Sequence, residues 1–241
     1  MLKVSRVIPI DQLASRQIEL WEHVAKDPGK LKKGGFFPCI TVSREIGSRG
    51  VDIANALGKA LNWTVYDKEL VEAIASRADV HTNIVEMFDE KTRQELNDWV
   101  MTILHSHSLS KDRYFKHLVA TMASIGRHES AVIVGRGGNF IMPDETTLKV
   151  RIAAPLDDRI TYVSDEMQQG RGSTATLIKR KEEEQVNYTR KYFRRDIDDP
   201  LRYDLFLNTK HLDVDAAAKT LIDALAHKLK KSRKSLVKPE D

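Results

Sequence analysis

Short apolar runs alternate with amphipathic segments along most of the chain. The runs that predict buried strands are rich in β-branched and aromatic residues and cover residues 37–42, 63–66, 131–134, 148–152 and 203–209. Helical spacing of apolar residues is found at 51–61, in several stretches from 68 to 128, at 156–195 with a break near 170–172, and at 214–230. This alternation predicts an α/β fold with a parallel sheet covered by helices on both faces.

The first 35 residues precede this alternation. Asp11 is a candidate N-cap for a helix that runs to about residue 26, and Asp27-Pro28-Gly29 would end it. We expect a helical N-terminal extension at 1–35, an α/β domain at 36–228 and a basic tail at 229–241. Docking onto the α/β domain or onto a second subunit, as in a homodimer, is the expected role of the extension.

Every conspicuous polar motif follows a predicted strand. Residues 43–50 follow the first strand, Asp67 the second, residues 135–138 the third and Asn208-Thr209 the last. In an open α/β sheet, ligands bind beyond the carboxyl ends of the strands. The sequence therefore predicts a single site to which these segments contribute.

The first of these loops has the composition of a phosphate-binding turn. Gly47 and Gly50 allow backbone amides to turn inward, the helix that starts near Val51 offers its positive end, and Arg44 and Arg49 add charge. The loop departs from the G-x-x-x-x-G-K-[ST] pattern, because Gly50 stands where the lysine is expected. A plain turn with two solvated arginines is the alternative.

Two further groups of cations are candidates for anion binding. Arg136 lies between glycines at a strand end, where its planar fork suits a phosphate, with an ion pair to Asp67 or Asp144 as the alternative. Residues 190–195 carry four cations in six positions. They form either a solvated helix face or a mobile lid that brings arginines to a transferring phosphoryl group.

Charge and composition narrow the function classes. The net charge of +4 comes from the last 14 residues, because the rest of the chain has equal numbers of basic and acidic side chains. This balance argues against a nucleic-acid-binding face and indicates a solvated tail.

Cys39 is the single cysteine, no apolar run has the length of a membrane span, and no signal-peptide core follows Met1. We expect a cytoplasmic protein with no membrane partner; the spacing of His105, His107 and His117 does not favour a metal site.

Four segments together resemble the cytidylate kinase-like proteins, relatives of bacterial cytidylate kinase among the P-loop nucleoside-monophosphate kinases. Residues 40–50 and 61–70 resemble the start of that family, 132–138 its Gly-Arg strand end, and 203–209 its closing strand. The resemblance covers about residues 36–228. It implies a P-loop NTPase-like nucleoside-monophosphate kinase fold, with a helical acceptor-side region at about 68–130 and a lid at about 156–200.

The resemblance also implies roles for individual residues. The ATP phosphates would be bound by Ser43, Arg44, Gly47, Ser48, Arg49 and Gly50. The acceptor would be bound by Asp67, Lys68 and Arg136. Catalytic cations would be Arg44, Arg136, Arg190 and Arg194, with Lys191 and Arg195 as other lid candidates. Mg²⁺ would lie near Asp52 or Ser48, and the missing lysine would be replaced by Arg44, Arg49 or Lys68.

The function that follows from the resemblance is ATP-dependent phosphoryl transfer to a nucleoside monophosphate, with CMP or dCMP as the acceptor that the family suggests. Gly137 stands where bacterial cytidylate kinase has the aspartate of Gly-Arg-Asp. Cytosine or ribose recognition is therefore open. A nucleotide sensor without catalysis and a kinase of a different small molecule are the alternatives.

Overall fold

The computed structural model describes residues 9–25, 35–77, 90–106 and 112–238, which fall into two compact units. One unit contains the described residues up to Phe36 together with those from Tyr66 to His128, and the other contains 37–65 and the described residues from Glu129 onward. The predicted helix stop at Asp27-Pro28-Gly29, His107 and the last three residues lie outside the described part.

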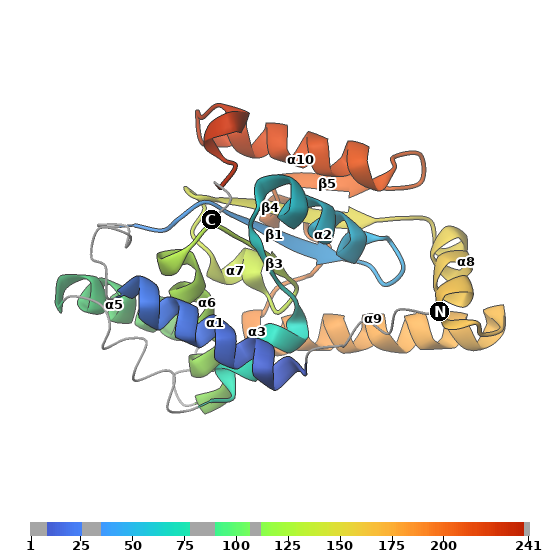
Figure 1. Cartoon of the computed structure of the whole chain (residues 1–241). Helices are drawn as coiled ribbons and strands as arrows, with labels where there is room; N and C mark the ends of the chain where they lie inside the picture. The colour runs from blue at the N-terminus through green and yellow to red at the C-terminus, as the bar shows by residue number, and fades with distance from the viewer. Residues whose placement is uncertain (1–8, 26–34, 78–89, 107–111, 239–241) are drawn as a thin grey trace, which may run out of the picture. The chain divides into compact units, whose positions relative to one another are not determined.

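The second unit is built on a five-stranded parallel sheet with the order β2-β3-β1-β4-β5 (Figure 1). The central strand β1 (Cys39–Arg44) pairs in parallel with β3 (Ala131–Val134) on one side and with β4 (Thr147–Ala153) on the other. The edge strands are β2 (Thr64–Tyr66) and β5 (Leu205–Asn208). The predicted α/β class is confirmed.

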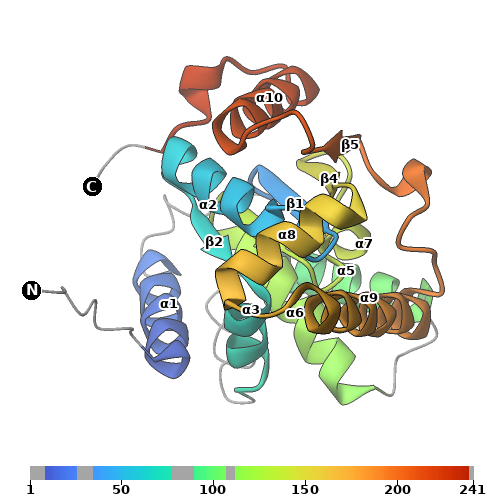
Figure 2. The same ribbon diagram turned by 90° about the vertical axis from the view of Figure 1, so that its right-hand side faces the viewer.

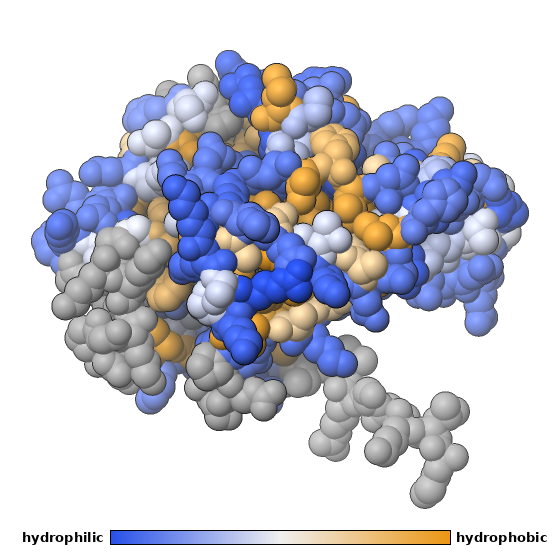
Figure 3. Space-filling view, turned by 90° about the horizontal axis from the view of Figure 1, so that it is seen from above, coloured by the Kyte–Doolittle hydropathy of each residue, from blue (hydrophilic) through white to orange (hydrophobic). Residues whose placement is uncertain are grey.

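Helices of this unit cover both faces of the sheet. On one face α2 (Gly50–Leu61) and α10 (Val214–Lys228) pack against alternate strand residues such as Ile40 and Val132, and this layer is the main apolar core. On the other face the short helix α7 (Gly138–Ile141) lies on β1, with the Gly138 position close to Thr41. The side of the molecule that carries α10 is mostly hydrophilic, with apolar residues gathered in smaller areas (Figure 3).

Two helices follow β4. They are α8 (Leu156–Met167) and α9 (Arg171–Phe193), and the break between them at 168–170 agrees with the predicted interruption. A 3-10 turn, η1 (Pro200–Arg202), then leads into β5. Viewed toward the carboxyl ends of the strands, α8 crosses in front of the sheet and α9 is seen end-on (Figure 2).

The expected basic tail is described as far as Lys238, and its cations from Lys230 onward are exposed, but the segment is attached to the second unit. After α10 the chain forms a second 3-10 turn, η2 (Arg233–Ser235), and the side chain of Leu236 is buried. The Trp63 indole N–H donates to the Leu236 carbonyl at 2.9 Å, and the Lys238 amide donates to Leu61 at 2.9 Å. One leucine among cations gives no periodic signal, so the sequence does not predict the attachment of this segment beside the end of α2.

The first unit consists of helices. They are α1 (Ile10–Ala25), α3 (Lys68–Ala75), α5 (Glu90–Ser106) and α6 (Arg113–His128). Helix α1 packs on α3, which packs on α6, and the buried Trp21 ring stacks on His128 with centroids 5.3 Å apart. The N-terminal extension therefore forms one compact unit with the helices of the predicted acceptor-side region.

Candidate functional site

Strand β1 begins and ends two residues later than predicted, so it carries the first two residues of the predicted loop. Ser43 and Arg44 pair in register with Arg151 and Ile152 of β4, so they are strand residues and not loop residues. The strand continues because β4 extends alongside it. The connection to α2 is therefore only residues 45–49.

This short loop turns through two left-handed positions. Gly47 has φ +84°, and a Cβ there would lie 2.7 Å from the Arg159 carbonyl oxygen. Arg49 has φ 60° and is the N-cap of α2, with no side-chain hydrogen bond to the first turn. The first amides of α2 consequently point out of the helix end without a side-chain cap, which is the arrangement that binds an anion.

Arg159 of α8 holds the loop from one side. Its guanidinium donates to the Ile46 carbonyl at 3.1 Å and to the Ala154 carbonyl at 2.9 Å, and it forms ion pairs with Glu45, 3.3 Å away, and with Glu182 of α9. The Glu45 carboxylate also accepts from the Ala154 amide at 3.0 Å. One buried arginine thus joins the loop, the end of β4 and α9.

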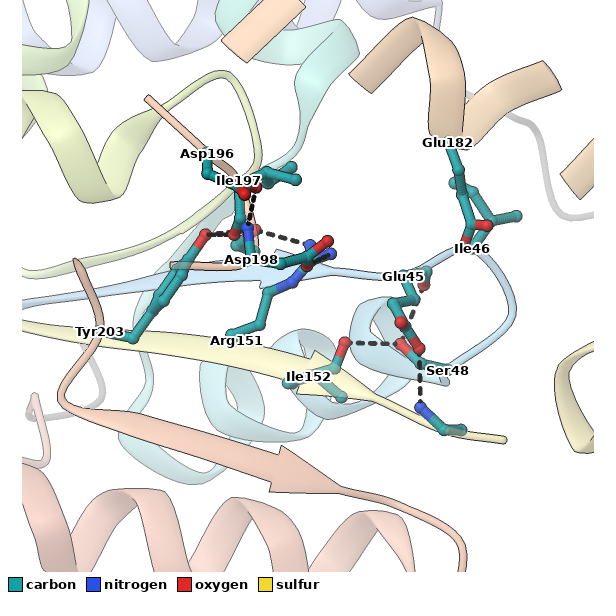
Figure 4. A network of polar contacts seen from close by, with 12 residues as sticks. Glu45, Ile46, Ser48, Arg151, Ile152, Glu182, Asp196, Ile197, Asp198 and Tyr203 are labelled. Atoms are coloured by element: carbon teal, nitrogen blue, oxygen red, sulfur yellow. Dashed lines mark hydrogen bonds and ion pairs between the residues drawn. The ribbon is translucent and has the colours of Figure 1, made fainter. Parts of the chain in front are cut away.

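Main-chain carbonyls and hydroxyls hold the loop from the other side. The hydroxyl of Ser48, which is fully buried, donates to the carbonyls of Glu45 at 2.9 Å and Ile152 at 3.2 Å (Figure 4). Thr209, directly after β5, donates its hydroxyl to the Ser48 carbonyl at 3.1 Å. The predicted motif after the last strand therefore does meet the first loop.

Arg44 lies between this loop and the loop after β3. A Cβ placed on Gly50 would be 2.6 Å from the Cβ of Arg44, so the arginine stem runs along the start of α2. The Nη1 atom of Arg44 is 3.1 Å from the Cβ position of Gly135. The strand end thus carries a guanidinium from the first glycine loop to the second.

The loop at residues 135–138 is shaped by aromatic side chains of α9. Arg136 has φ 51° and its guanidinium lies 4.9 Å from the centroid of the Tyr188 ring. Gly137 has φ +72°, and a Cβ there would be 2.1 Å from the Phe193 ring, which itself stacks on Phe140. The observed neighbour of Arg136 on α9 is therefore an aromatic face, a favourable position for a guanidinium.

Asp144, one of the acids considered as a partner of Arg136, accepts a hydrogen bond from the ammonium of Lys149. This hydrogen bond lowers the pKa of the Asp144 carboxyl below its usual value. The carboxylate is 81% exposed and has a cation of its own on β4. The ion-pair alternative thus receives no support from Asp144.

Ser43 belongs to a buried network that the sequence analysis missed. Arg151, only 4% exposed, donates to the Ser43 hydroxyl at 3.0 Å. It also donates to Asp198 at 2.7 Å (Figure 4). Tyr203 donates its hydroxyl to the Ile197 carbonyl at 2.7 Å and lies 3.3 Å from Ser43, and burial raises the pKa of this tyrosine. A charged residue inside the apolar run 148–152 was the signal for Arg151.

Asp52, a predicted metal ligand, is engaged on the surface of α2. Its carboxylate accepts from Arg49 at 3.2 Å and from the hydroxyl of Tyr162 at 3.0 Å. Burial, followed by the hydrogen bond to Asp52, raises the pKa of the Tyr162 hydroxyl, which therefore stays protonated. Within the described ranges, no group of three His, Cys, Asp or Glu side chains is arranged to hold a metal ion.

A cleft of about 490 Å³ runs along one face of α9. Of the predicted lid cations, Arg190 lines this cleft, whereas Arg194 is the exposed, left-handed C-cap of the helix. Lys191 lies over the Tyr192 ring at 4.7 Å. The cleft is lined by Lys179, Glu182, Glu183, Val186, Asn187 and Arg190. Glu182, which binds Arg159, places this face of α9 next to the first loop.

Asp67 and Lys68 belong to the helical unit and begin α3 there. The Asp67 carboxylate caps the helix by accepting from the Leu70 amide at 2.8 Å. Their predicted roles toward an acceptor stay predictions. Among the helices of the described ranges, none has the length and apolarity that a membrane span requires.

Comparison with known proteins adds a family and a fold. The model of the cytidylate kinase-like family matches residues 39–211, well over half of the chain. The crystal structure of an uncharacterized protein from Eubacterium ventriosum is similar with a TM-score of 0.64 and 21% identity, covering 79% of this chain and 98% of that one. A shikimate kinase from Bacteroides thetaiotaomicron aligns with a TM-score of 0.39 and 9% identity over 80% and 98% of the two chains. No curated protein matches with significance.

Proposed function

Because this chain belongs to the cytidylate kinase-like family, we propose that it transfers the γ-phosphoryl group of ATP to a nucleoside monophosphate, with CMP and dCMP as the first candidates. The family suggests phosphoryl transfer and nucleotide substrates. The observation that carries the proposal is the loop at residues 45–49, which opens α2 through two left-handed positions beside a second, arginine-bearing loop.

The first loop is the proposed donor site. Main-chain amides at the start of α2 would bind the ATP phosphates, and Arg44 and Arg49 would supply positive charge. Phosphoryl transfer depends mainly on alignment and charge neutralisation, since the bond from the γ-phosphorus to the ADP oxygen breaks as the bond to the acceptor oxygen forms. A loop that Arg159 and Ser48 hold from both sides suits this demand for fixed geometry.

The second loop is the proposed acceptor side. Arg136 would bind the phosphate of the acceptor, with Tyr188 holding its guanidinium in place. Asp67 and Lys68 would contribute from the start of α3. Arg190, which lines the cleft along α9, is the lid arginine that we propose first, and Arg194 at the end of the helix is the second.

The residues near the loop fit Mg²⁺ only in part. Asp52 is a carboxylate that keeps about a third of its side chain exposed, and Mg²⁺ in kinases is commonly held by one or two carboxylates, water and the substrate phosphates. Ser48 fits poorly, because its buried hydroxyl donates to two carbonyls. When bound with the nucleotide, Mg²⁺ would neutralise charge on the donor phosphates.

One group of observations favours the alternative, a nucleotide sensor that binds without transfer. Gly50 replaces the lysine that normally reaches the β- and γ-phosphates, and Asp52 is already engaged by Arg49 and Tyr162. A protein of this kind would retain the loop for binding and lack turnover.

Coupled detection of ADP separates the two functions. The protein would be tested with ATP and Mg²⁺ against CMP, dCMP, UMP, AMP and a set of small alcohols, with ATP binding measured in parallel by isothermal titration calorimetry. Turnover with a nucleoside monophosphate supports the proposal, and turnover with an alcohol alone would identify a kinase of a different small molecule. ATP binding without turnover on any acceptor would establish the sensor and refute the kinase.

A further inference from the structure

The first loop lacks lysine, so a different cation must meet the donor phosphates if the proposed function is right. We propose that Arg44, the last residue of β1, takes over the role of the missing lysine, and that Gly50 is glycine because the Arg44 side chain occupies the space beside it. This inference rests on the proposed function and selects one of the three cations considered from the sequence.

The Arg44 side chain fills the space in which a side chain at position 50 would lie. A Cβ at this position would lie 2.6 Å from the Cβ and 2.9 Å from the Cγ of Arg44, both closer than real side chains approach. The next neighbour, the Cβ of Ile152, is 3.7 Å away, which is an ordinary van der Waals contact. The left-handed positions of the loop are Gly47 and Arg49, and Gly50 is the first residue of α2. The Arg44 side chain alone therefore excludes a side chain at position 50.

The Arg44 guanidinium reaches the loop at residues 135–138. Its Nη1 atom is 3.1 Å from the Cβ position of Gly135, so the side chain runs from the donor loop to the loop that carries Arg136. Because β1 is paired with β3 and β4, the backbone that carries this arginine is well fixed. A guanidinium between the two proposed phosphate sites would contact the group that is transferred between them.

Arg49, the other arginine of this region, is less well placed. Arg49 donates to Asp52 at 3.2 Å, lies 5.7 Å from the Tyr162 ring and is about half exposed, so it is engaged on the flank of α2. Lys68 belongs to the helical unit and not to the unit that contains the loop. Arg44 is the one whose stem fills the position of the lost lysine.

Binding of ATP and of inorganic tripolyphosphate, measured by isothermal titration calorimetry, tests the role of the charge. We expect Arg44→Ala to weaken both about ten- to a hundredfold, the loss typical of a charge-assisted hydrogen bond to phosphate. Arg44→Lys should recover part of this loss, Arg49→Ala should weaken binding less than Arg44→Ala does, and the control Lys219→Ala on the exposed side of α10 should leave binding unchanged. Equal binding by wild type and Arg44→Ala would overturn the inference, as would a larger loss in Arg49→Ala.

A reciprocal exchange tests the shared space. Gly50→Lys alone should reduce thermal stability and binding, because the new side chain collides with Arg44, and Arg44→Gly alone should lose binding. The double variant Arg44→Gly, Gly50→Lys should bind tripolyphosphate at least tenfold better than Arg44→Gly, because the lysine then has room at its usual position. A double variant that is folded by circular dichroism and binds no better than Arg44→Gly would overturn the exchange.

The inference and the proposed function can fail separately. Wild type that binds polyphosphate through Arg44 and turns over no acceptor would refute the kinase and keep the inference. Turnover that is unchanged in Arg44→Ala would keep the kinase and refute the inference. Wild type that binds neither ATP nor tripolyphosphate would refute both.

Discussion

The loops that follow β1 and β3 are held in different ways. Residues 45–49 are fixed by polar contacts from several elements, with Arg159 on one side and the buried Ser48 hydroxyl on the other. Residues 135–138 are instead covered by aromatic rings of α9, with Tyr188 on Arg136 and Phe193 on Gly137. Hydrogen bonds have strict geometry, whereas ring contacts tolerate sliding.

This difference suits a phosphoryl-transfer site in which the two loops would have different tasks. A donor loop of fixed shape keeps its amides aimed at a polyphosphate before the nucleotide arrives, which lowers the cost of reorganisation. If Arg136 binds the acceptor as proposed, its contact with Tyr188 would link acceptor binding to the position of α9. The two glycine loops would then serve different purposes even though both lie at strand ends.

Removing the contacts of Arg159 with the first loop should cost the most stability. We expect Arg159→Leu to lower the free energy of unfolding by about 2–4 kcal/mol, since it removes a buried cation from Glu45 and Glu182, which keep a quarter to a third of their exposure. ATP binding should fall with it. The measurement is urea denaturation together with titration calorimetry.

Arg171→Leu is the matched control for Arg159→Leu. Arg171 begins the neighbouring helix α9 and pairs with Asp157, but both side chains are more than half exposed. Its loss should cost less than about 1 kcal/mol and leave ATP binding intact. Equal losses of stability in the two variants would show that the first loop does not depend on the buried contacts of Arg159.

The next effect concerns the aromatic cover of the second loop. Gly137→Ala should lower the free energy of unfolding by about 1–3 kcal/mol, because a Cβ is strained at φ +72° and meets the Phe193 ring at 2.1 Å. Adding Phe193→Leu should recover part of the lost free energy of unfolding, because the smaller side chain leaves room for the new Cβ. Gly172→Ala, where no atom lies within 4 Å of the new Cβ, should be neutral or slightly stabilising. If Gly137→Ala is as stable as wild type, Phe193 does not fill this space.

The strands and the two glycine loops could be predicted because their signals are local. The run 131–134 is a strand with the predicted bounds, and residues 135–138 follow it as a turn into α7, a helix too short to show any periodicity. The parallel α/β fold and the family, expected from four separate motifs, are both confirmed. The roles of the individual site residues stay predictions.

The contacts that hold the site could not be predicted, because they join residues far apart in the sequence. In the sequence, Arg159 is one charged residue of an amphipathic helix. It contacts Ile46 only because of the way α8 packs. Phe193 reads as a residue near the end of a charged helix, yet it covers Gly137. Arg44 was assigned to the loop, because the pairing that keeps β1 extended depends on β4.

The hydrogen bond between Tyr162 and Asp52 is a peripheral contact at the start of α2, and its loss should cost the least stability. Tyr162→Phe removes the hydrogen bond to Asp52 and should lower the free energy of unfolding by about 0.5–1.5 kcal/mol at pH 8. The pKa of Tyr162 is raised in the folded protein, so the protonated hydroxyl is the form that the fold favours. Its contribution is complete below the ordinary tyrosine pKa of 10.0 and is lost as the pH rises through the higher folded value. The difference between wild type and Tyr162→Phe, measured by urea denaturation at pH 8 and pH 10.5, should therefore shrink at the higher pH. A difference that is the same at both pH values would mean that the hydroxyl proton is not what links α8 to the start of α2.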